Sequence, residues 1–360
     1  DNVFELFSNN KQNIYRNNES EAIKFYCDSL RSNIGKINSD EYVDGCGKWA
    51  PSEGKKWDKE RGAFKKLCEY LNITPKEMRQ NYIKPLRDAH HKQWQLVEKL
   101  LCDKNYNNIN FNKVPSQAMK IYSKKTFPSH CDNFEVWKDA LIANIGNTKV
   151  NTKTLFVYTP VDEYIKRMTD LKDFIVSDNL IEKQWEEIIV DNILKNGIFK
   201  NSVAVVDTSS SMFSSLYKSN TRLITISVAM GLLISQCSSA PWNNHVFTFD
   251  TEPSFVEISG NNLAEKLTSI LNIPWGGTTN FYKIHKLIID KALNMNLKQD
   301  DLPDKIFVFS DMQFNSADSS YMTNHTWAKN EYEKHGFTMP KIIYWNLNGN
   351  TKDVPSDAFD

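Results

Sequence analysis

From residue 200 onward, short runs of β-branched and aromatic residues alternate with longer stretches of helical periodicity. Near-continuous apolar strands separated by helices indicate a mostly parallel sheet whose two faces are both covered. We therefore expect a doubly wound α/β fold in this part of the chain. The expected strands are SVAVVD at 202–207, HVFTFD at 245–250, SFVEI at 254–258, KIFVFSD at 305–311 and KIIYWNL at 341–347, with helices at 221–236, 262–271, 281–296 and 326–335.

The first part of the chain carries mostly the helical period instead. Apolar side chains recur at helical spacing over 64–71 and again over 164–175. The stretch TPKE at 74–77 has the pattern of a capped helix start, with a hydroxyl, a proline and a glutamate in the required order. The sequence thus predicts an all-α domain over 1–198 that precedes the α/β domain at 199–360.

One segment of the helical part has the composition of a loop. Residues 35–62 are rich in Gly, Ser, Asp and Lys and show no helical stripe. Two tryptophans, Trp49 and Trp57, interrupt this polar segment. We expect both indole rings to anchor the segment in the core.

The composition limits the partners and the cellular compartment that we expect for the protein. Its formal net charge is zero, so the overall charge attracts neither nucleic acid nor a membrane. Six cysteines are scattered without the spacing of a metal site, which favours reduced thiols in an intracellular compartment. No secretory signal and no apolar run of membrane-spanning length is visible. We expect a cytoplasmic protein without a membrane partner, or one packaged in a virion if its source is viral.

Oxygen-bearing side chains follow two of the expected strands and enter one of the expected helices. Asp207, Ser209 and Ser211 come directly after the first strand, Asp311 ends KIFVFSD, and Thr278 belongs to the loop PWGGTTNF. Because ligands of such sheets bind beyond the carboxyl ends of the strands, we expect these groups to meet at one rim. Three hydroxyls and two carboxylates suit Mg²⁺ or Mn²⁺, whereas the lack of imidazole and thiolate argues against zinc. A cation held by so few anionic ligands would attract a carboxylate from a protein partner.

The three motifs DTSSS, GGTT and FVFSD, in this order after hydrophobic strands, resemble the metal-ion-dependent adhesion site of von Willebrand factor A domains. The resemblance covers about residues 200–350. It implies that Ser209 and Ser211 bind the metal directly and that Thr278 does so in the ligand-engaged state. It also implies that Asp207 and Asp311 act mainly through water.

Enzyme motifs match the chain less well. Haloacid dehalogenase phosphatases begin with D-x-D after a strand, but here the third position is Ser209. No G-x-S-x-G surrounds a serine, and no P-loop motif occurs. We therefore expect a non-catalytic protein, and a metal-dependent phosphoesterase stays open as a less favoured alternative.

A helical region followed by a von Willebrand factor A domain resembles the Ro autoantigen (TROVE) family, whose helical repeats bind RNA. The stretches KWAPSEGKKWDK, NKVPSQAM, FVFSDMQF and IIYWNL also resemble an uncharacterised domain family of large DNA viruses and some eukaryotes. Bottom-up support for RNA comes from residues 61–130, which hold 14 Lys and Arg against 5 Asp and Glu. The candidate RNA-binding residues are Lys65, Lys66, Lys84, Arg87, Lys92, Lys124 and Lys125.

These observations give one leading interpretation and two alternatives. The leading one is a non-catalytic binding protein whose Mg²⁺-dependent adhesion site recruits an acidic partner group, with structured or single-stranded RNA as a ligand of the helical domain. In such a ribonucleoprotein the basic stretch contacts phosphates. The alternative for that stretch is a solvated lysine face, and the alternative function is a purely protein-binding structural or virion assembly module.

Overall fold

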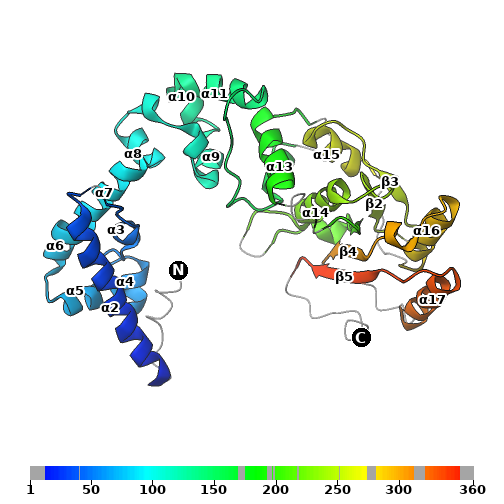
Figure 1. Cartoon of the computed structure of the whole chain (residues 1–360), viewed down its shortest axis with the longest axis horizontal. Helices are drawn as coiled ribbons and strands as arrows, with labels where there is room; N and C mark the ends of the chain where they lie inside the picture. Colours follow the sequence, from blue (N-terminus) through cyan, green and yellow to red (C-terminus); the bar gives the residue numbers. More distant parts are fainter. Residues whose placement is uncertain are drawn as a thin grey trace. The chain divides into compact units, whose positions relative to one another are not determined.

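The computed structural model describes residues 13–39, 41–168, 175–192, 197, 199–216, 219–250, 252–273, 281–311 and 321–348. The chain forms two compact units, Asp1–Ile109 and Asn110–Asp360 (Figure 1). A helical N-terminal region is followed by a mixed, mostly parallel sheet with helices, so the expected α/β class is confirmed. In the part of the chain that the structure describes, no helix combines the length and the apolar character needed to cross a membrane.

The first unit is helical and is built around a core that includes the stripe expected over 64–71. Phe64, Leu67, Cys68 and Leu71 are all buried on one face of the same helix, which confirms that prediction. The capped start is also confirmed, because the Thr74 hydroxyl accepts from the backbone N–H of Glu77 at 3.2 Å. The elements are α2 (Asn13–Lys36), α3 (Cys46–Trp49), α4 (Lys56–Arg61), α5 (Ala63–Leu71), α6 (Pro75–Glu77), a π-helical stretch η1 (Met78–Ile83), α7 (Lys84–Trp94), α8 (Val97–Cys102) and η2 (Tyr106–Asn108).

The loop expected at 35–62 is wrong in part, because it contains α3 and α4. These helices have 4 and 6 residues, so each spans too few turns to show a helical stripe in the sequence. Trp57 packs against the core of the unit as expected. Trp49 does not, since 68% of its surface is exposed.

The second unit begins with further helices. Phe111, Phe127 and Phe134 pack edge to face or tilted at centroid distances of 5.2 and 5.3 Å and form the centre of this helical part. The stripe expected over 164–175 is not one helix where the structure describes it, because α12 ends at Ile165 and residues 166–168 and 175–178 are not helical. Leu171 of this stripe lies outside the described residues. The elements of this part are η3 (Phe111–Lys113), α9 (Ser116–Tyr122), α10 (Thr126–His130), α11 (Asp132–Ile142), α12 (Thr159–Ile165) and α13 (Asn179–Asn192).

Tyr164 of α12 is hydrogen-bonded to residues that lie further along the chain. Its hydroxyl accepts the backbone N–H of Asp178 at 2.9 Å and donates to the Glu182 carboxylate at 2.6 Å. Glu182 in turn accepts the first backbone N–H groups of the helix that starts at Leu263. These hydrogen bonds link three segments: α12, the start of the helix that contains Glu182, and the start of the helix at Leu263.

The rest of the second unit is a five-stranded sheet in the order β3-β2-β1-β4-β5. Only β3 runs antiparallel to its neighbour β2 among these strands, and the other pairs are parallel. The expected strands and helices are found within a few residues of their predicted limits. They are β1 (Ser202–Val206), η5 (Ser210–Phe213), α14 (Leu223–Cys237), β2 (His245–Thr248), β3 (Phe255–Glu257), α15 (Leu263–Leu271), α16 (Phe281–Asn294), η6 (Gln299–Asp301), β4 (Lys305–Ser310), α17 (Tyr321–Lys334) and β5 (Lys341–Asn346).

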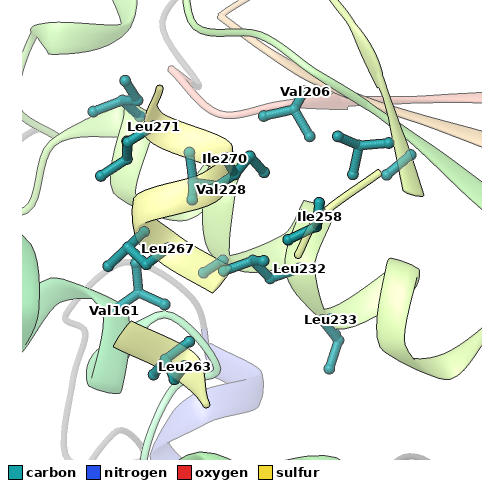
Figure 2. Close-up of a cluster of buried hydrophobic side chains, with 14 of the residues drawn as sticks. Val161, Val206, Val228, Leu232, Leu233, Ile258, Leu263, Leu267, Ile270 and Leu271 are labelled. Atoms are coloured by element: carbon teal, nitrogen blue, oxygen red, sulfur yellow. The ribbon is translucent and has the colours of Figure 1, made fainter. Parts of the chain in front are cut away.

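Both faces of the sheet are covered, as the continuous apolar strands predict. Alternate residues of β1 point to opposite faces: Ala204 and Val206 join the core formed with α14 and α15, whereas Val203 and Val205 join the core with α16 and α17. The two pairs of helices lie on opposite sides of the strands (Figure 1). The helical part and the sheet share one of these cores, since Val161 of α12 packs with α14 and α15 (Figure 2).

This shared core explains where the compact units divide. Helices α12 and α13 lie on α14 and α15, so the unit that contains the sheet starts at Asn110. The boundary expected at residue 198 falls inside that unit, and as a boundary between sequence modules it stays a prediction.

Candidate cation site

The strand order reverses direction at the carboxyl ends of β1 and β4. These two parallel strands pair directly, with Val206 opposite Phe309 at the end of the ladder. From β1 the chain continues to β2 and β3 on one side, whereas β5 lies on the other side of β4. Ligands of open α/β sheets bind at such a switch in strand order. The residues that follow β1 and β4 are therefore the ones to examine.

Asp207 is the first residue after β1 and is held in place by its own neighbours. Its backbone N–H donates to the Phe309 carbonyl at 3.2 Å, which extends the pairing with β4 by one residue. One carboxylate oxygen accepts from the backbone N–H of Ser209 at 2.9 Å, and the other accepts from the Ser310 hydroxyl at 2.5 Å. Only 1% of Asp207 is exposed, so both oxygens of a buried carboxylate are fixed in direction.

Two hydroxyls follow this carboxylate in the sequence. Ser209 is extended and Ser211 lies in the first turn of η5, and this change of backbone direction brings their Oγ atoms to 3.1 Å. Both side chains are half-buried, whereas Ser210 between them is exposed. Two oxygens bound to one Mg²⁺ at about 2.1 Å and at a right angle would lie about 3.0 Å apart. The two hydroxyls therefore already have the spacing of neighbouring ligands of an octahedral cation.

Asp311 brings a second carboxylate to this end of the sheet. It follows β4 and is 2% exposed. Burial raises the pKa of Asp207, and the charge of Asp311 adds to this shift, whereas the hydrogen bonds from Ser209 and Ser310 oppose it. Two buried carboxylates that repel each other are stabilised by a cation between or beside them. The donor set thus fits a hard divalent ion in both its chemistry and its charge.

Four of the five predicted metal ligands lie in the described residues, and the structure brings them to the same strand ends. Thr278 lies outside the described residues. Sequence reasoning did not assign a role to Ser310, because its contact with Asp207 depends on the register between β1 and β4. Within the described ranges, no group of three or more His, Cys, Asp or Glu side chains has the arrangement of a metal site.

The predicted RNA-binding residues are divided between the two compact units, with Lys124 and Lys125 in the second and the others in the first. Three of them lie in ion pairs: Lys65 with Glu69 at 3.8 Å, Lys66 with Glu19, and Lys124 with Glu163 at 2.6 Å. The others are Lys84, Arg87 and Lys92 on α7 and the exposed Lys125. Where the structure describes the chain, these four side chains form no ion pair.

Comparisons with known proteins place the chain in a family. Residues 5–199 match the family described as Domain of unknown function (DUF2828). The chain belongs to this family. Residues 201–359 match a second family, Domain of unknown function (DUF7788).

A viral protein and a bacterial protein structure are similar to the chain. Uncharacterized protein L728 of Acanthamoeba polyphaga mimivirus is 30% identical over an alignment of 353 residues. The match covers 92% of this chain and 58% of the relative. The chain thus spans little more than half of that protein, and the expected kinship with an uncharacterised viral protein is confirmed. The crystal structure of the Deinococcus radiodurans Ro (RSR) protein aligns with 98% of this chain and 80% of that chain, at a TM-score of 0.40 and 12% identity. A likeness at that level assigns neither a fold nor a ligand.

Proposed function

We propose that the protein binds Mg²⁺ or Mn²⁺ at the ends of β1 and β4 and uses the bound ion to recruit an acidic group of a protein partner. The observation that carries this proposal is the pair of hydroxyls, Ser209 and Ser211, 3.1 Å apart beside two buried carboxylates. Their position at the switch in strand order supports a ligand site. The resemblance of DTSSS and FVFSD to a von Willebrand factor A adhesion site agrees with this arrangement.

Each described residue has its own role in the proposal. Ser209 and Ser211 bind the ion directly through Oγ. Asp207 and Asp311 balance its charge through water, because both oxygens of Asp207 are already engaged by Ser209 and Ser310. Thr278 stays the predicted third hydroxyl ligand. The remaining coordination positions are open to water or to a carboxylate of the partner.

The same contacts argue for binding rather than catalysis. In the phosphoesterase alternative, Asp207 would have to attack a phosphate. Its two oxygens accept hydrogen bonds from Ser209 and Ser310, and these bonds stabilise the carboxylate and weaken it as a nucleophile. We therefore propose an adhesion role in protein assembly and no turnover at this site.

Isothermal titration calorimetry with Mg²⁺ and Mn²⁺ tests the proposal. The double substitution Ser209→Ala and Ser211→Ala should abolish binding without unfolding the protein, because both hydroxyls lie at the rim. Ser210→Ala is the matched control, since Ser210 is exposed between them and should be dispensable. Unchanged affinity in the double variant would contradict the assignment. Metal-dependent hydrolysis of p-nitrophenyl phosphate that Asp207→Asn abolishes would support the phosphoesterase instead.

RNA is a second candidate ligand, and the observation that favours it is the set of cations on α7. Lys84, Arg87 and Lys92 follow one another along this helix and are exposed or half-buried. If they contact phosphates, the logarithm of the RNA affinity should fall linearly with the logarithm of salt concentration, by about 0.7 to 0.9 per contact. Replacement of all three by Glu should weaken RNA binding in fluorescence anisotropy. No saturable binding of the wild type at low salt would contradict this second proposal.

A further inference from the structure

Trp49 is the starting point, because its indole ring lies at the surface of the helical unit. It is 68% exposed, although it was expected to anchor the segment in the core. A single exposed hydrophobic residue is common and needs no explanation. The case differs here because the ring is mounted on a hydrogen-bonded, closely packed support and the Lys48 ammonium group lies over its face.

The support begins with the turn that precedes α3. The backbone N–H of Cys46 donates to the Asp44 carboxylate at 2.7 Å, and the Asp44 backbone N–H donates to the Asn33 side chain at 2.9 Å. Asn33 returns a bond from its amide nitrogen to Asp44 at 3.0 Å. The hydroxyl of Tyr26 donates to the Cys46 carbonyl at 2.6 Å. These bonds fix the turn on α2 before the chain reaches the indole.

Close packing against α7 completes the support. Gly47 is buried, and a Cβ atom at this position would lie 2.3 Å from the Cβ of Leu86 and 3.1 Å from the backbone nitrogen of Arg87. The two helices therefore touch through their backbones, and α3 lies directly beside α7 (Figure 1). An aromatic ring on such a rigid element loses little freedom when a flat ligand stacks on it.

Basic side chains lie at the ring and on the neighbouring helix α7. The Nζ of Lys48 lies over the Trp49 ring, 5.2 Å from its centroid. Lys84, Arg87 and His91 have the spacing i, i+3 and i+7, so they share one face of α7. Burial lowers the pKa of His91; Lys48 and Arg87 add to this shift, and Asp88 opposes it. Lys48 of α3 and Arg87 of α7 therefore lie near the same histidine, whereas Asp44 is hydrogen-bonded within the turn.

We propose that Trp49 is a stacking platform for a base of single-stranded nucleic acid, with Lys48, Lys84 and Arg87 beside it to receive the backbone phosphates. A flat ring and flanking cations match the two parts of a nucleotide. The platform refines the RNA candidate of the preceding subsection and does not depend on the cation site of the other unit. It also names a residue outside the basic stretch 61–130.

Fluorescence anisotropy of a labelled 12-nucleotide single strand, as RNA and as DNA, tests the platform with the full-length protein. Trp49→Ala should weaken binding roughly 5- to 150-fold, the range measured for loss of one aromatic–base stack. Trp49→Phe should retain most of the affinity, because a smaller aromatic face remains. Phe25→Ala is the matched control, since Phe25 lies in the same unit and is also 68% exposed. Circular dichroism should show all three variants folded.

The outcomes separate the platform from the broader RNA proposal. Wild-type binding with a loss in Trp49→Ala alone supports the platform. Equal affinity of wild type and Trp49→Ala overturns it and leaves the α7 phosphate contacts standing. Equal affinity for a duplex of the same length also overturns the platform, and so does competition by poly-glutamate equal to that by the single strand. In either case the surface would recognise negative charge and not bases. Absence of any nucleic-acid binding overturns both.

Discussion

The packing of α14 on β1 depends on Gly231, and we predict that replacing this glycine destabilises the protein. A Cβ atom on Gly231 would lie 2.3 Å from Cγ2 of Val206 and 3.7 Å from Cγ1 of Val246. In the interior of a helix, Gly→Ala by itself stabilises by about 1 kcal/mol. An added methyl in a filled core destabilises by about 1–3 kcal/mol. Because a 2.3 Å approach is far inside contact distance and Val206 is buried, we take the upper part of that cost, about 2–3 kcal/mol, and expect Gly231→Ala to destabilise the protein by roughly 1–2 kcal/mol net.

Calorimetric melting measures this effect. A loss of this size in a unit of about 250 residues should lower Tm by roughly 2–8 °C. Val206→Ala removes the Cγ2 methyl group that meets the new side chain, so the double variant should be more stable than the sum of the single effects predicts. Gly35→Ala is the control, because Gly35 lies in α2 with nothing within 4 Å of a new Cβ and should not be destabilised. If Gly231→Ala melts at or above the wild-type temperature, or the two sites show no coupling, the packing argument is refuted.

Three further predictions concern single side chains. Glu182→Gln should destabilise the second unit by roughly 1.5–3 kcal/mol in urea unfolding, because the carboxylate accepts the first two backbone N–H groups of α15; an unchanged midpoint would contradict this. Burial raises the pKa of Glu163, but Lys124 and Lys120 outweigh it and hold that pKa below its ordinary value. The ion pairs therefore stabilise the fold at pH values above the pKa that Glu163 has in the unfolded chain, and this stabilisation is lost as the pH falls through its lower pKa in the folded protein. Below about pH 4.5, Glu163→Gln should therefore lose less stability than wild type. Parallel profiles of stability against pH for the two proteins would argue against this. Thr74→Ala should destabilise by about 1 kcal/mol through loss of the helix cap, and unchanged helix content and stability would rule that out.

The order of strands and helices after residue 200 was predictable because each element is long enough to show its period. The inner strands β1 and β4 are buried on both faces and read as continuous apolar runs, so their positions follow from hydrophobicity alone. Segment 35–62 shows the opposite case, since helices of 4 and 6 residues leave no stripe. Of the spacing over 164–175, Met168 and Ile175 lie in non-helical stretches, and Leu171 lies outside the described residues. Ile175 is buried from a non-helical segment that Tyr164 ties back to Asp178.

For the candidate cation site, the sequence predicts the loop after β1 and Asp311 after β4, but not the contact that Ser310 makes. Asp207, Ser209 and Ser211 lie within five residues of one another, so their proximity needs no knowledge of the fold. Ser310 acts on Asp207 across the ladder between β1 and β4, and no feature of the sequence fixes the register of two parallel strands. Trp49 poses the same difficulty, because its exposure depends on how α3 packs against α7.

The central claim is that a divalent ion binds at the ends of β1 and β4 through two hydroxyls. Crystals of the protein grown with Mn²⁺, measured for anomalous scattering, test it most directly. We predict one anomalous peak about 2.1 Å from the Oγ atoms of both Ser209 and Ser211, within about 0.2 Å, with Asp207 and Asp311 reached through water. A peak at another place, or no peak beside these two serines at millimolar Mn²⁺, would contradict the account.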